Sequence, residues 1–343
     1  MKAVRFHEHG GREVLRYEDV RDPSPRPTEV LLRVKAVALN HLDVWLRKGL
    51  PGMTIPLPKI GGCDIAGEVA AVGASCSRIA VGQRVLVSPG ISCGQCAACL
   101  RGDDNLCRAF KVVGGYALDG GCADFACVPE VNCIPVPDTL DYPGAAAVPV
   151  TFVTAWNMLV RQARLAAGED VLVMGVGSGV GTAAVQIAKL FGARVIAVAG
   201  TDEKLAKAKA LGADEGINYA RQDLAQEIRR LTSKRGVDVV FEHVGGATWQ
   251  KLIPNIASGG RLVTCGASAG HEGSVDIRYL FSKSVSILGA FLGTKADMLT
   301  VVKHLASGRL RPVIDRTLPL AECAEGHRLL EERAVFGKVV LVP

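Results

Sequence analysis

The chain has 343 residues, which is enough for two domains with sizeable cores. Apolar residues make up 49% and charged residues 22%, proportions typical of a globular protein and not of a disordered or fibrous chain. The formal net charge of +6 is spread along the chain without a dense basic block, so we expect no nucleic-acid partner and a small anionic ligand fits better.

The N-terminal stretch "MKAVRFHEHGG" lacks the apolar core of a signal peptide, so we expect a cytoplasmic protein. The longest uncharged run, Tyr142 to Val160, contains two prolines and several polar residues. It predicts a buried turn-and-helix region and no membrane span. Because cytoplasmic thiols stay reduced, the eleven cysteines predict no disulfide framework.

The first 140 residues contain short Val-rich segments bounded by Gly, Pro or Asp, among them "EVLLRVKAVAL", "AGEVAAVG", "GQRVLVSPG" and "CADFACVPE". Segments of this length and partial alternation are typical of β-strands. Few helix-period patterns interrupt them. This part of the chain predicts a compact β domain.

From about Gly168 strands alternate with helices. The strand "DVLVMG" precedes a Gly-rich turn and an amphipathic helix, and the unit repeats through the expected helix "TWQKLIPNIASGG" to the strand "SVSILGAF". Such alternation predicts a parallel sheet covered on both faces. The tail ending "FGKVVLVP" has β character again. We therefore expect a Rossmann doubly wound domain, residues 150–289, inserted into a β domain formed by residues 1–149 and 290–343.

The turn "GVGSGVG" lies between a predicted strand and a predicted helix. Glycines there permit a tight turn, and the helix that follows directs its positive end toward a phosphate. This context predicts a dinucleotide pyrophosphate site. Its residues are Gly175, Gly177, Ser178, Gly179, Val180 and Gly181.

The residues at the end of the second Rossmann strand determine whether the site prefers NAD(H) or NADP(H). An NAD site usually has an acidic residue there, and this chain has the uncharged Ala199 and Gly200. The expected nucleotide contacts are Thr201, Lys204 and Tyr219. Asp202 and Glu203 suit the first turn of a helix but can also reach a ribose. The pattern favours NADP(H) over NAD(H).

The stretch "CGQCAACLRGDDNLC" carries four cysteines, Cys93, Cys96, Cys99 and Cys107. Four thiolates fill a tetrahedral zinc shell and leave no position for water or substrate. The spacing therefore predicts a structural metal site.

In their order along the whole chain, "GGREVLRYEDV", "GGCDIAGEVAAVG", the four-cysteine lobe, the Gly-rich unit and "GKVVLVP" resemble the medium-chain dehydrogenase/reductase superfamily. The resemblance implies a GroES-like β domain with one structural zinc per chain, a Rossmann domain and a small-molecule substrate. It also implies homodimers or homotetramers that pair the last Rossmann strands. The dinucleotide would further contact Val244, Gly266, Ala267 and Phe291.

The same resemblance bears on a catalytic zinc. Asn40, Cys63, Asp64 and Val150 stand where the alcohol dehydrogenase branch has its ligands, and Asn and Val bind zinc poorly or not at all. Leu42 and Trp45 stand where that branch has a proton relay. A second metal site of other composition stays open. Its candidate ligands are His41, Asp43, Cys63 and Asp64.

Asn40 and the "GVGSGVG" turn resemble the zinc-independent quinone oxidoreductase branch. A quinone, an enone or an activated carbonyl accepts hydride without a Lewis acid when donors hold its oxygen. The resemblance implies catalytic positions at Asn40, Asp43 and Thr154: Asn40 as donor, Thr154 at the nicotinamide, and Asp43 in a structural hydrogen bond. Two alternatives remain: a zinc alcohol dehydrogenase with an atypical site, and a non-enzymatic structural or binding protein.

Overall fold

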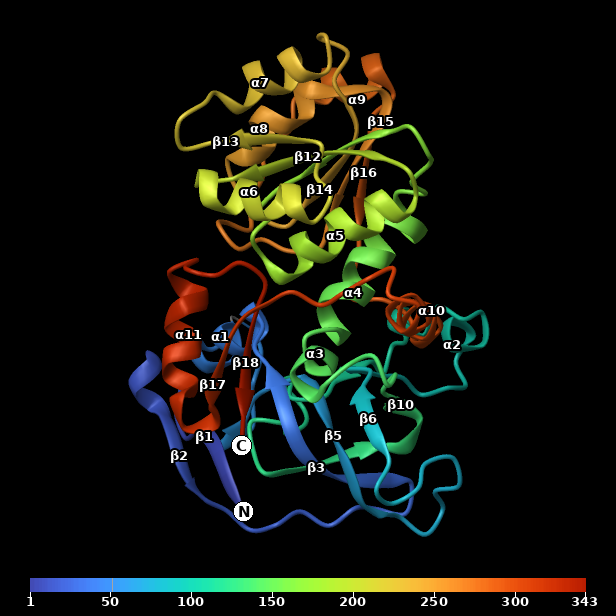
Figure 1. Cartoon of the computed structure of the whole chain (residues 1–343), viewed down its shortest axis with the longest axis vertical. Helices are drawn as coiled ribbons and strands as arrows, with labels where there is room; N and C mark the ends of the chain where they lie inside the picture. Colours follow the sequence, from blue (N-terminus) through green and yellow to red (C-terminus); the bar gives the residue numbers. More distant parts are fainter. Residues whose placement is uncertain (51) are drawn as a thin grey trace. The chain divides into compact units, whose positions relative to one another are not determined.

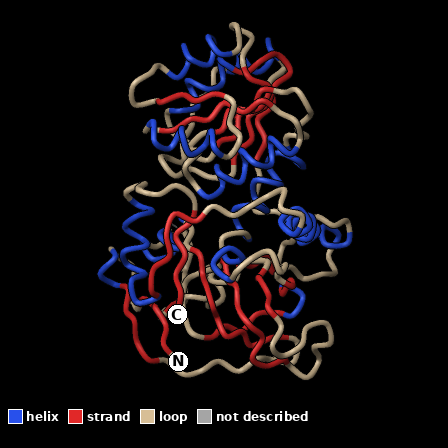
Figure 2. The backbone as a smooth tube through the Cα atoms, in the orientation of Figure 1, coloured by secondary structure: helices blue, strands red, loops and turns tan. Residues whose placement is uncertain are grey.

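The computed structural model describes residues 1–50 and 52–343, and the chain divides into two compact units. The first unit comprises Met1–Val150 and Thr294–Pro343, and the second is the continuous segment Thr151–Gly293. Within the described ranges, no helix is long and apolar enough to cross a membrane. Figure 2 shows that each unit has a sheet at its centre.

The second unit contains a six-stranded parallel sheet among the described residues, with strand order β13-β12-β11-β14-β15-β16 (Figure 1). The strands are β11 (Asp170–Val173), β12 (Arg194–Ala199), β13 (Glu215–Asn218), β14 (Val237–Glu242), β15 (Ile256–Thr264) and β16 (Ser286–Gly289). The strand order reverses between β11 and β14. This is the doubly wound arrangement, in which ligands bind beyond the carboxyl ends of the strands.

Helices cover this sheet on both faces, as Figure 1 shows. They are α5 (Gly179–Leu190), α6 (Asp202–Ala210), α7 (Leu224–Leu231), α8 (Thr248–Leu252) and α9 (Ile277–Lys283). Helix α4 (Pro149–Trp156) precedes the sheet along the chain, and the π-helical segment that follows it (Asn157–Gln162) contacts β15 and β16. The side chains of Ser178, Thr201 and Asp223 cap α5, α6 and α7 by accepting a hydrogen bond from a first-turn amide. Leu172, Ile196 and other apolar residues of the strands pack with α7, α8 and α9 in one core.

The helix expected over "TWQKLIPNIASGG" is shorter in the structure. Helix α8 ends at Leu252, and one 3₁₀ turn (Ile253–Asn255) leads directly into β15. Pro254 has no amide hydrogen to continue the helix. Ile256 instead pairs with Val237 of β14, and the register then shifts before the next pairs. The last residues of the expected helix therefore belong to a strand.

The first unit contains a mainly antiparallel sheet with the order β10-β6-β5-β3-β18-β17, and β9 also pairs with β3. The strands are β3 (Glu29–Ala38), β5 (Asp64–Val72), β6 (Arg84–Val87), β9 (Phe125–Pro129), β10 (Cys133–Pro135), β17 (Ile314–Pro319) and β18 (Lys338–Val342). Alternate apolar side chains, such as Val30, Leu32 and Val34 of β3, point into one core.

Two small sheets and five helices complete this unit within the described residues. The strands are β1 (Lys2–Phe6), β2 (Leu15–Asp19) and β4 (Lys59–Ile60) in one sheet, and β7 (Gly90–Ile91) and β8 (Lys111–Val112) in the other. The helices are α1 (His41–Lys48), α2 (Ala97–Leu100), α3 (Tyr142–Ala146), α10 (Lys295–Ala306) and α11 (Cys323–Glu331). The uncharged run over 142–160 forms α3, α4 and part of the π-helical segment, so the prediction of a turn-and-helix region is confirmed.

Candidate active site and cysteine lobe

Three strands bring three polar side chains of the first unit together. Strand β3 lies between β5 and β18 and runs antiparallel to both, so the ends where β5 and β18 begin lie beside the end of β3. Asn40 follows β3, Asp64 opens β5 and Lys338 opens β18. Gly337 has a φ of +104° and sits so close to the carbonyl of Val313 that a Cβ would collide with it. Only glycine suits that position directly before Lys338.

The three side chains form a closed hydrogen-bonded ring. The Nζ of Lys338 donates to Oδ1 of Asn40 at 2.6 Å and to Oδ2 of Asp64 at 2.8 Å. The Nδ2 of Asn40 donates to the same Oδ2 of Asp64 at 2.9 Å, and the amide of Val150 donates to its Oδ1 at 2.8 Å. Asp64 is fully buried and Lys338 nearly so, while Asn40 is half-buried. The desolvation cost of burying this carboxylate is offset because a cation and two further donors hydrogen-bond to it.

Asp43 accepts hydrogen bonds from the backbone next to this ring. Its carboxylate accepts from the amide of Asn40 and from the amide of Gly62, each at 2.8 Å. Burial raises the pKa of Asp43, although the nearby His327 and the two amide donors oppose the rise. The carboxylate thus joins the start of α1 to the turn that carries Cys63 and Asp64.

The candidate ligands of a second metal do not gather into a cluster. Among the residues that the structure describes, three or more His, Cys, Asp or Glu ligand atoms converge only in the cysteine lobe. The ring of His41 packs against Trp45, with centroids 6.2 Å apart. Burial, followed by the charges of Asp64 and Asp43, raises the pKa of Cys63 well above its usual range, so its thiol stays protonated.

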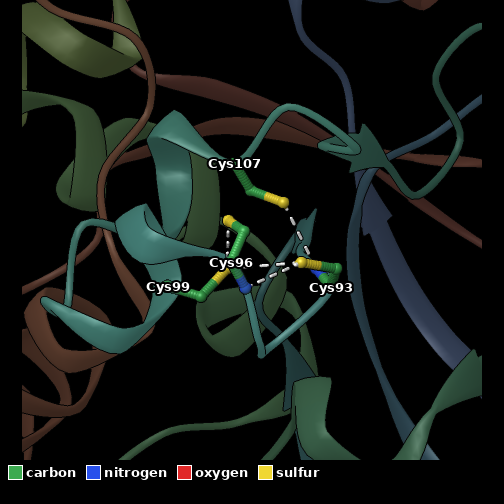
Figure 3. A group of neighbouring side chains, drawn as sticks. All are labelled: Cys93, Cys96, Cys99 and Cys107. Carbon is green, nitrogen blue, oxygen red and sulfur yellow. Dashed lines mark hydrogen bonds between the residues drawn. The ribbon is translucent and has the colours of Figure 1, made fainter.

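The cysteine lobe is compact and fits a metal. The ligand atoms of the four cysteines, Cys93, Cys96, Cys99 and Cys107, all lie within 4.8 Å of one another. The Sγ of Cys99 is 3.5 Å from that of Cys96 and 3.9 Å from that of Cys93. A tetrahedral zinc with sulfur at about 2.3 Å has its sulfurs about 3.8 Å apart. Figure 3 shows the four side chains directed toward a common space.

A second contact ties this lobe to the C-terminal part of the first unit. Asp104 accepts from the Nζ of Lys295 at 3.0 Å and from its amide at 3.2 Å. The same Nζ lies 3.2 Å from the hydroxyl of Ser92. Because Lys295 opens α10, the position of the lobe depends on residues almost two hundred positions later.

In the second unit, the predicted phosphate turn leads from β11 into α5. Ser178 caps α5 by accepting from the amide of Gly181 at 2.9 Å. The Nε2 of His243 lies 2.9 Å from the carbonyl of Met174 and 3.2 Å from Oγ of Ser178. A carbonyl only accepts, so Nε2 carries a proton. Burial lowers the pKa of His243, so its ring is neutral. The ring packs against the phosphate turn. A Cβ on Gly175 would lie 2.9 Å from this ring.

Glu242 organises the loop that follows β14. Its side chain is fully buried at the end of the strand. Oε1 accepts from the amides of Val244 and Gly245 at 2.6 and 2.7 Å. Oε2 accepts from Nε1 of Trp249 at 3.0 Å and from the hydroxyl of Thr264 at 3.2 Å. One carboxylate thus fixes the loop containing Val244, which would otherwise carry buried unpaired amides.

The other predicted nucleotide contacts lie at the carboxyl ends of their strands. Thr201 caps α6, and the hydroxyl of Tyr219 comes so close to Gly200 that a Cβ there would lie 2.8 Å from it. A Cβ on Gly266 would lie 3.2 Å from the carbonyl of His243, and Phe291 is 55% exposed just after β16. A Cβ on Gly245 would lie 3.1 Å from the Cα of Ala267, so the loops after β14 and β15 touch.

Asp202 is engaged within the protein. It accepts from Nδ2 of Asn218 and from the guanidinium of Arg221, each at 2.6 Å. The hydrogen bond from Asn218, with help from Arg221, lowers the pKa of Asp202. This carboxylate therefore has two partners within the protein.

Thr154 on α4 carries an unsatisfied polar atom. Its side chain is buried, and Oγ1 has no hydrogen-bond partner among the described residues. Val153 of α4 and Asn157 of the π-helical segment pack on the segment after β16: a Cβ on Gly293 would strike Val153, and Nδ2 of Asn157 donates to the carbonyl of Leu292 at 2.8 Å. Buried hydroxyls usually have a partner, so Oγ1 is an exception among the described residues.

Sequence reasoning missed two residues of these sites. Lys338 was visible as a single charge at the start of the apolar strand "KVVLV", and Glu242 as an acid ending the apolar strand "VDVVFE". A charged residue in a buried strand indicates a compensated site. The partners that compensate each charge come from other strands and leave no local signal.

Comparisons with known proteins agree with this architecture. Residues 26–138 match the family described as alcohol dehydrogenase GroES-like domain, and residues 179–307 match zinc-binding dehydrogenase. Human quinone oxidoreductase is 30% identical over 352 residues, covering 100% of this chain and 98% of that protein. An NAD-dependent alcohol dehydrogenase of Sulfurisphaera tokodaii is 31% identical over 356 residues, covering 100% of both chains.

A crystal structure of an NAD-dependent alcohol dehydrogenase superposes with a TM-score of 0.96 at 48% identity, covering 100% of both chains. A TM-score of this size over the full length of both chains shows that the two structures have the same fold. With full-length relatives of this kind and both family matches, the chain belongs to the medium-chain dehydrogenase/reductase superfamily and is an oxidoreductase.

Proposed function

We propose that this oxidoreductase reduces quinones, enones or other activated carbonyl compounds with NAD(P)H and without a catalytic metal. The observation that carries the proposal is the ring of Asn40, Asp64 and Lys338. A fixed ammonium occupies the polar centre where the alcohol dehydrogenase branch would place zinc ligands. Lowering the pKa of an alcohol is a task for a metal, whereas an activated double bond needs only oriented donors.

The roles of the residues follow from their placement. Bound NAD(P)H supplies a hydride, which adds to the electrophilic carbon of the acceptor, and water supplies the proton that completes the reduction. Asn40 holds the carbonyl oxygen, on which negative charge grows as the hydride arrives. Thr154 contacts the nicotinamide, which supplies the partner that its buried Oγ1 lacks within the described residues.

NADP(H) is the favoured dinucleotide. Lys204 lies in the first turn of α6, which follows the end of β12, and Asp202 is already bound by Arg221 and Asn218. Basic groups at this strand end suit a 2′-phosphate. We expect NADPH to bind more tightly than NADH in a fluorescence titration. The variant Lys204→Ala should lose about 10-fold or more of its NADPH affinity and keep its NADH affinity, because a charge-assisted contact is worth about 1.5–3 kcal/mol.

The control for that titration is Lys207→Ala. Lys207 lies one turn further along α6 and pairs with Glu203 at 2.7 Å. This variant removes the same charge from the same helix but should leave the preference for NADPH over NADH unchanged. Equal affinities of the wild-type protein for the two nucleotides would contradict the assignment of NADP(H).

A zinc ion held by Cys93, Cys96, Cys99 and Cys107 is part of this proposal. Its support is the convergence of the four sulfurs at spacings that suit one tetrahedral ion. With all four positions filled by thiolates, such an ion stabilises the lobe and takes no part in hydride transfer.

The second candidate is an alcohol dehydrogenase with an atypical metal site. The crystal structure at 48% identity is that of an NAD-dependent alcohol dehydrogenase, and this favours the candidate. It requires His41, Cys63 and Asp64 to rearrange around a second zinc. The two candidates differ in zinc content: one ion per chain for the proposed reductase and two for the alcohol dehydrogenase.

One experiment separates the two candidates. Ethanol, longer alcohols and a panel of quinones and enones are assayed with each nucleotide on protein whose zinc content has been measured. We expect reduction of quinones or enones by protein with one zinc. Alcohol oxidation by protein with two zincs, lost in Cys63→Ala while the circular dichroism spectrum is unchanged, would establish the alcohol dehydrogenase instead.

We also propose a homodimer or homotetramer that pairs the edges of two β16 strands. Strand β16 ends the parallel sheet, and Ile277, Phe281 and Ile287 near this edge are exposed. Light scattering after gel filtration should give at least twice the chain mass, and Phe281→Asp should reduce it. A monomeric wild-type protein would contradict this proposal.

The expected compartment is the cytoplasm.

A further inference from the structure

Lys338 carries a charge in the candidate active site, and the sequence analysis did not identify it as a site residue. Its side chain is 5% exposed, and that of Asp64 is fully buried. The ammonium contacts both of the other side chains of the ring, Asn40 and Asp64. The question is whether it only neutralises Asp64 or also acts on Asn40.

The ammonium settles the orientation of the Asn40 amide. An ammonium cannot accept a hydrogen bond and a carboxylate cannot donate one. With Lys338 on one side and Asp64 on the other, Oδ1 must face Lys338 and Nδ2 must face Asp64. A rotation of the amide by 180° would place two donors against each other and two acceptors against each other. Asn40 therefore has one stable orientation.

This orientation leaves one amide hydrogen for a substrate. The first hydrogen of Nδ2 goes to Asp64 at 2.9 Å. The second has two weak contacts: Sγ of Cys63, a poor acceptor, at 3.3 Å, and the carbonyl of Ala38 at 3.4 Å. A substrate oxygen can take over this weakly held hydrogen with little loss. Because hydrogen bonds in a chain polarise one another, the cation on Oδ1 also makes Nδ2 a stronger donor.

The ring does not fit a catalytic metal. The cation already shares Oδ2 of Asp64, and a divalent ion on the same carboxylate would be repelled by it at short range. Among the described residues no cluster of three ligand atoms forms around Cys63. The charge that a metal would provide is present as part of the chain.

From this geometry we propose that Lys338 is a positioning residue of the reaction: it fixes and polarises the Asn40 amide that binds the substrate oxygen, and so replaces the charge of a catalytic metal. The proposal rests on the proposed reductase function. It adds no new step to that reaction. It assigns the stabilisation of the developing oxyanion to a lysine that acts through an amide.

The test needs a variant that folds. Lys338→Met alone leaves Asp64 buried without a cation, which can prevent folding. The double variant Lys338→Met/Asp64→Asn removes both charges and keeps the size of both side chains. Lys59→Met is the matched control, because Lys59 is a buried lysine that pairs with Asp119 in the segment between β8 and β9.

We expect the double variant to bind nucleotide normally and to lose about 10- to 100-fold in kcat, with little change in KM, because weakening an oxyanion donor acts on the transition state. Lys338→Arg, which keeps the cation, should recover much of the loss. The control should lose stability and keep kcat. A folded double variant with the wild-type kcat would overturn the proposal.

A binding measurement makes the test independent of turnover. Para-nitrophenolate carries its charge on an oxygen and mimics the oxyanion, and its absorption reports binding to the complex with NADP⁺. We expect affinity for the phenolate to fall about 10-fold or more in the double variant. Equal affinity in both proteins, or no binding by the wild type, would overturn the role of Lys338. Inactivity of the wild-type protein toward the whole panel would refute the proposed function alone.

Discussion

Replacement of Glu242 by glutamine tests whether one buried carboxylate holds the loop after β14. The glutamine keeps Oε1 for the amides of Val244 and Gly245, but places an amino group where Oε2 accepted from Trp249 and Thr264. The hydroxyl of Thr264 can rotate and accept instead. The indole of Trp249 can only donate, so two donors face each other in a buried site.

The expected cost follows from that single conflict. A buried donor left without its partner costs about 1–3 kcal/mol. For a unit of this size, each kcal/mol lowers the melting temperature by about 3 °C, so the transition of the second unit should fall by roughly 3–9 °C. Nucleotide affinity should fall as well, because the loop that carries Val244 is less well ordered.

A double-mutant cycle with Trp249→Phe identifies the cause. Phenylalanine has no donor, so Glu242→Gln should cost at least about 1 kcal/mol less in the Trp249→Phe background than in the wild type. Chemical unfolding of all four proteins, followed by circular dichroism, measures the cycle. An identical cost in the two backgrounds would refute the reasoning, and so would a cost below about 0.5 kcal/mol in the wild type.

Two further predictions concern the cysteine lobe and pH. Purified protein should contain about one zinc per chain, lost in Cys107→Ser but not in the control Cys76→Ser, with destabilisation of the lobe because a structural ion contributes folding energy; elemental analysis that finds the same zinc in both variants would contradict this. Burial lowers the pKa of His243 below its ordinary value despite the charge of Glu242. The stability from its neutral form is therefore complete above about pH 6.5 and is lost as the pH falls through the lower folded value. Unfolding at pH 7.5 and 5.5 should show a smaller pH effect in His243→Gln, and an equal effect would contradict the burial argument.

The sequence predicted the parts of this protein whose physical cause is local. The alternation of strands and helices predicted a Rossmann sheet inserted into a β domain, and this is confirmed. The spacing of Cys93 to Cys107 predicted a four-sulfur cluster, and the four sulfurs do converge. Turns, caps and closely spaced ligands depend on neighbours within a few residues, so their patterns can be read directly.

The ring of Asn40, Asp64 and Lys338 was not predictable in the same way. Lys338 and Asn40 are 298 positions apart, and only the order of the strands β5, β3 and β18 brings them together. Asn40 alone suggested a donor, but its partners and orientation depend on that order. The length of α8 is a different case. Pro254 was a visible signal that the helix ends early, and the Ser-Gly-Gly that follows permits the register shift in β15.

The position of β18 has a consequence for biosynthesis. This strand lies between β3 and β17, so the sheet of the first unit lacks an interior strand until the last residues of the chain have been made. Domains generally fold as units, in order of synthesis. Here the continuous segment Thr151–Gly293 is complete before the unit that starts at Met1. We therefore expect the second unit to fold first on the ribosome, while the end of β3 that pairs with β18 stays unpaired. A nascent chain that pauses before residue 338 would expose the β3 edge to other chains, which makes the C-terminal strand a protection against aggregation as well as the source of Lys338.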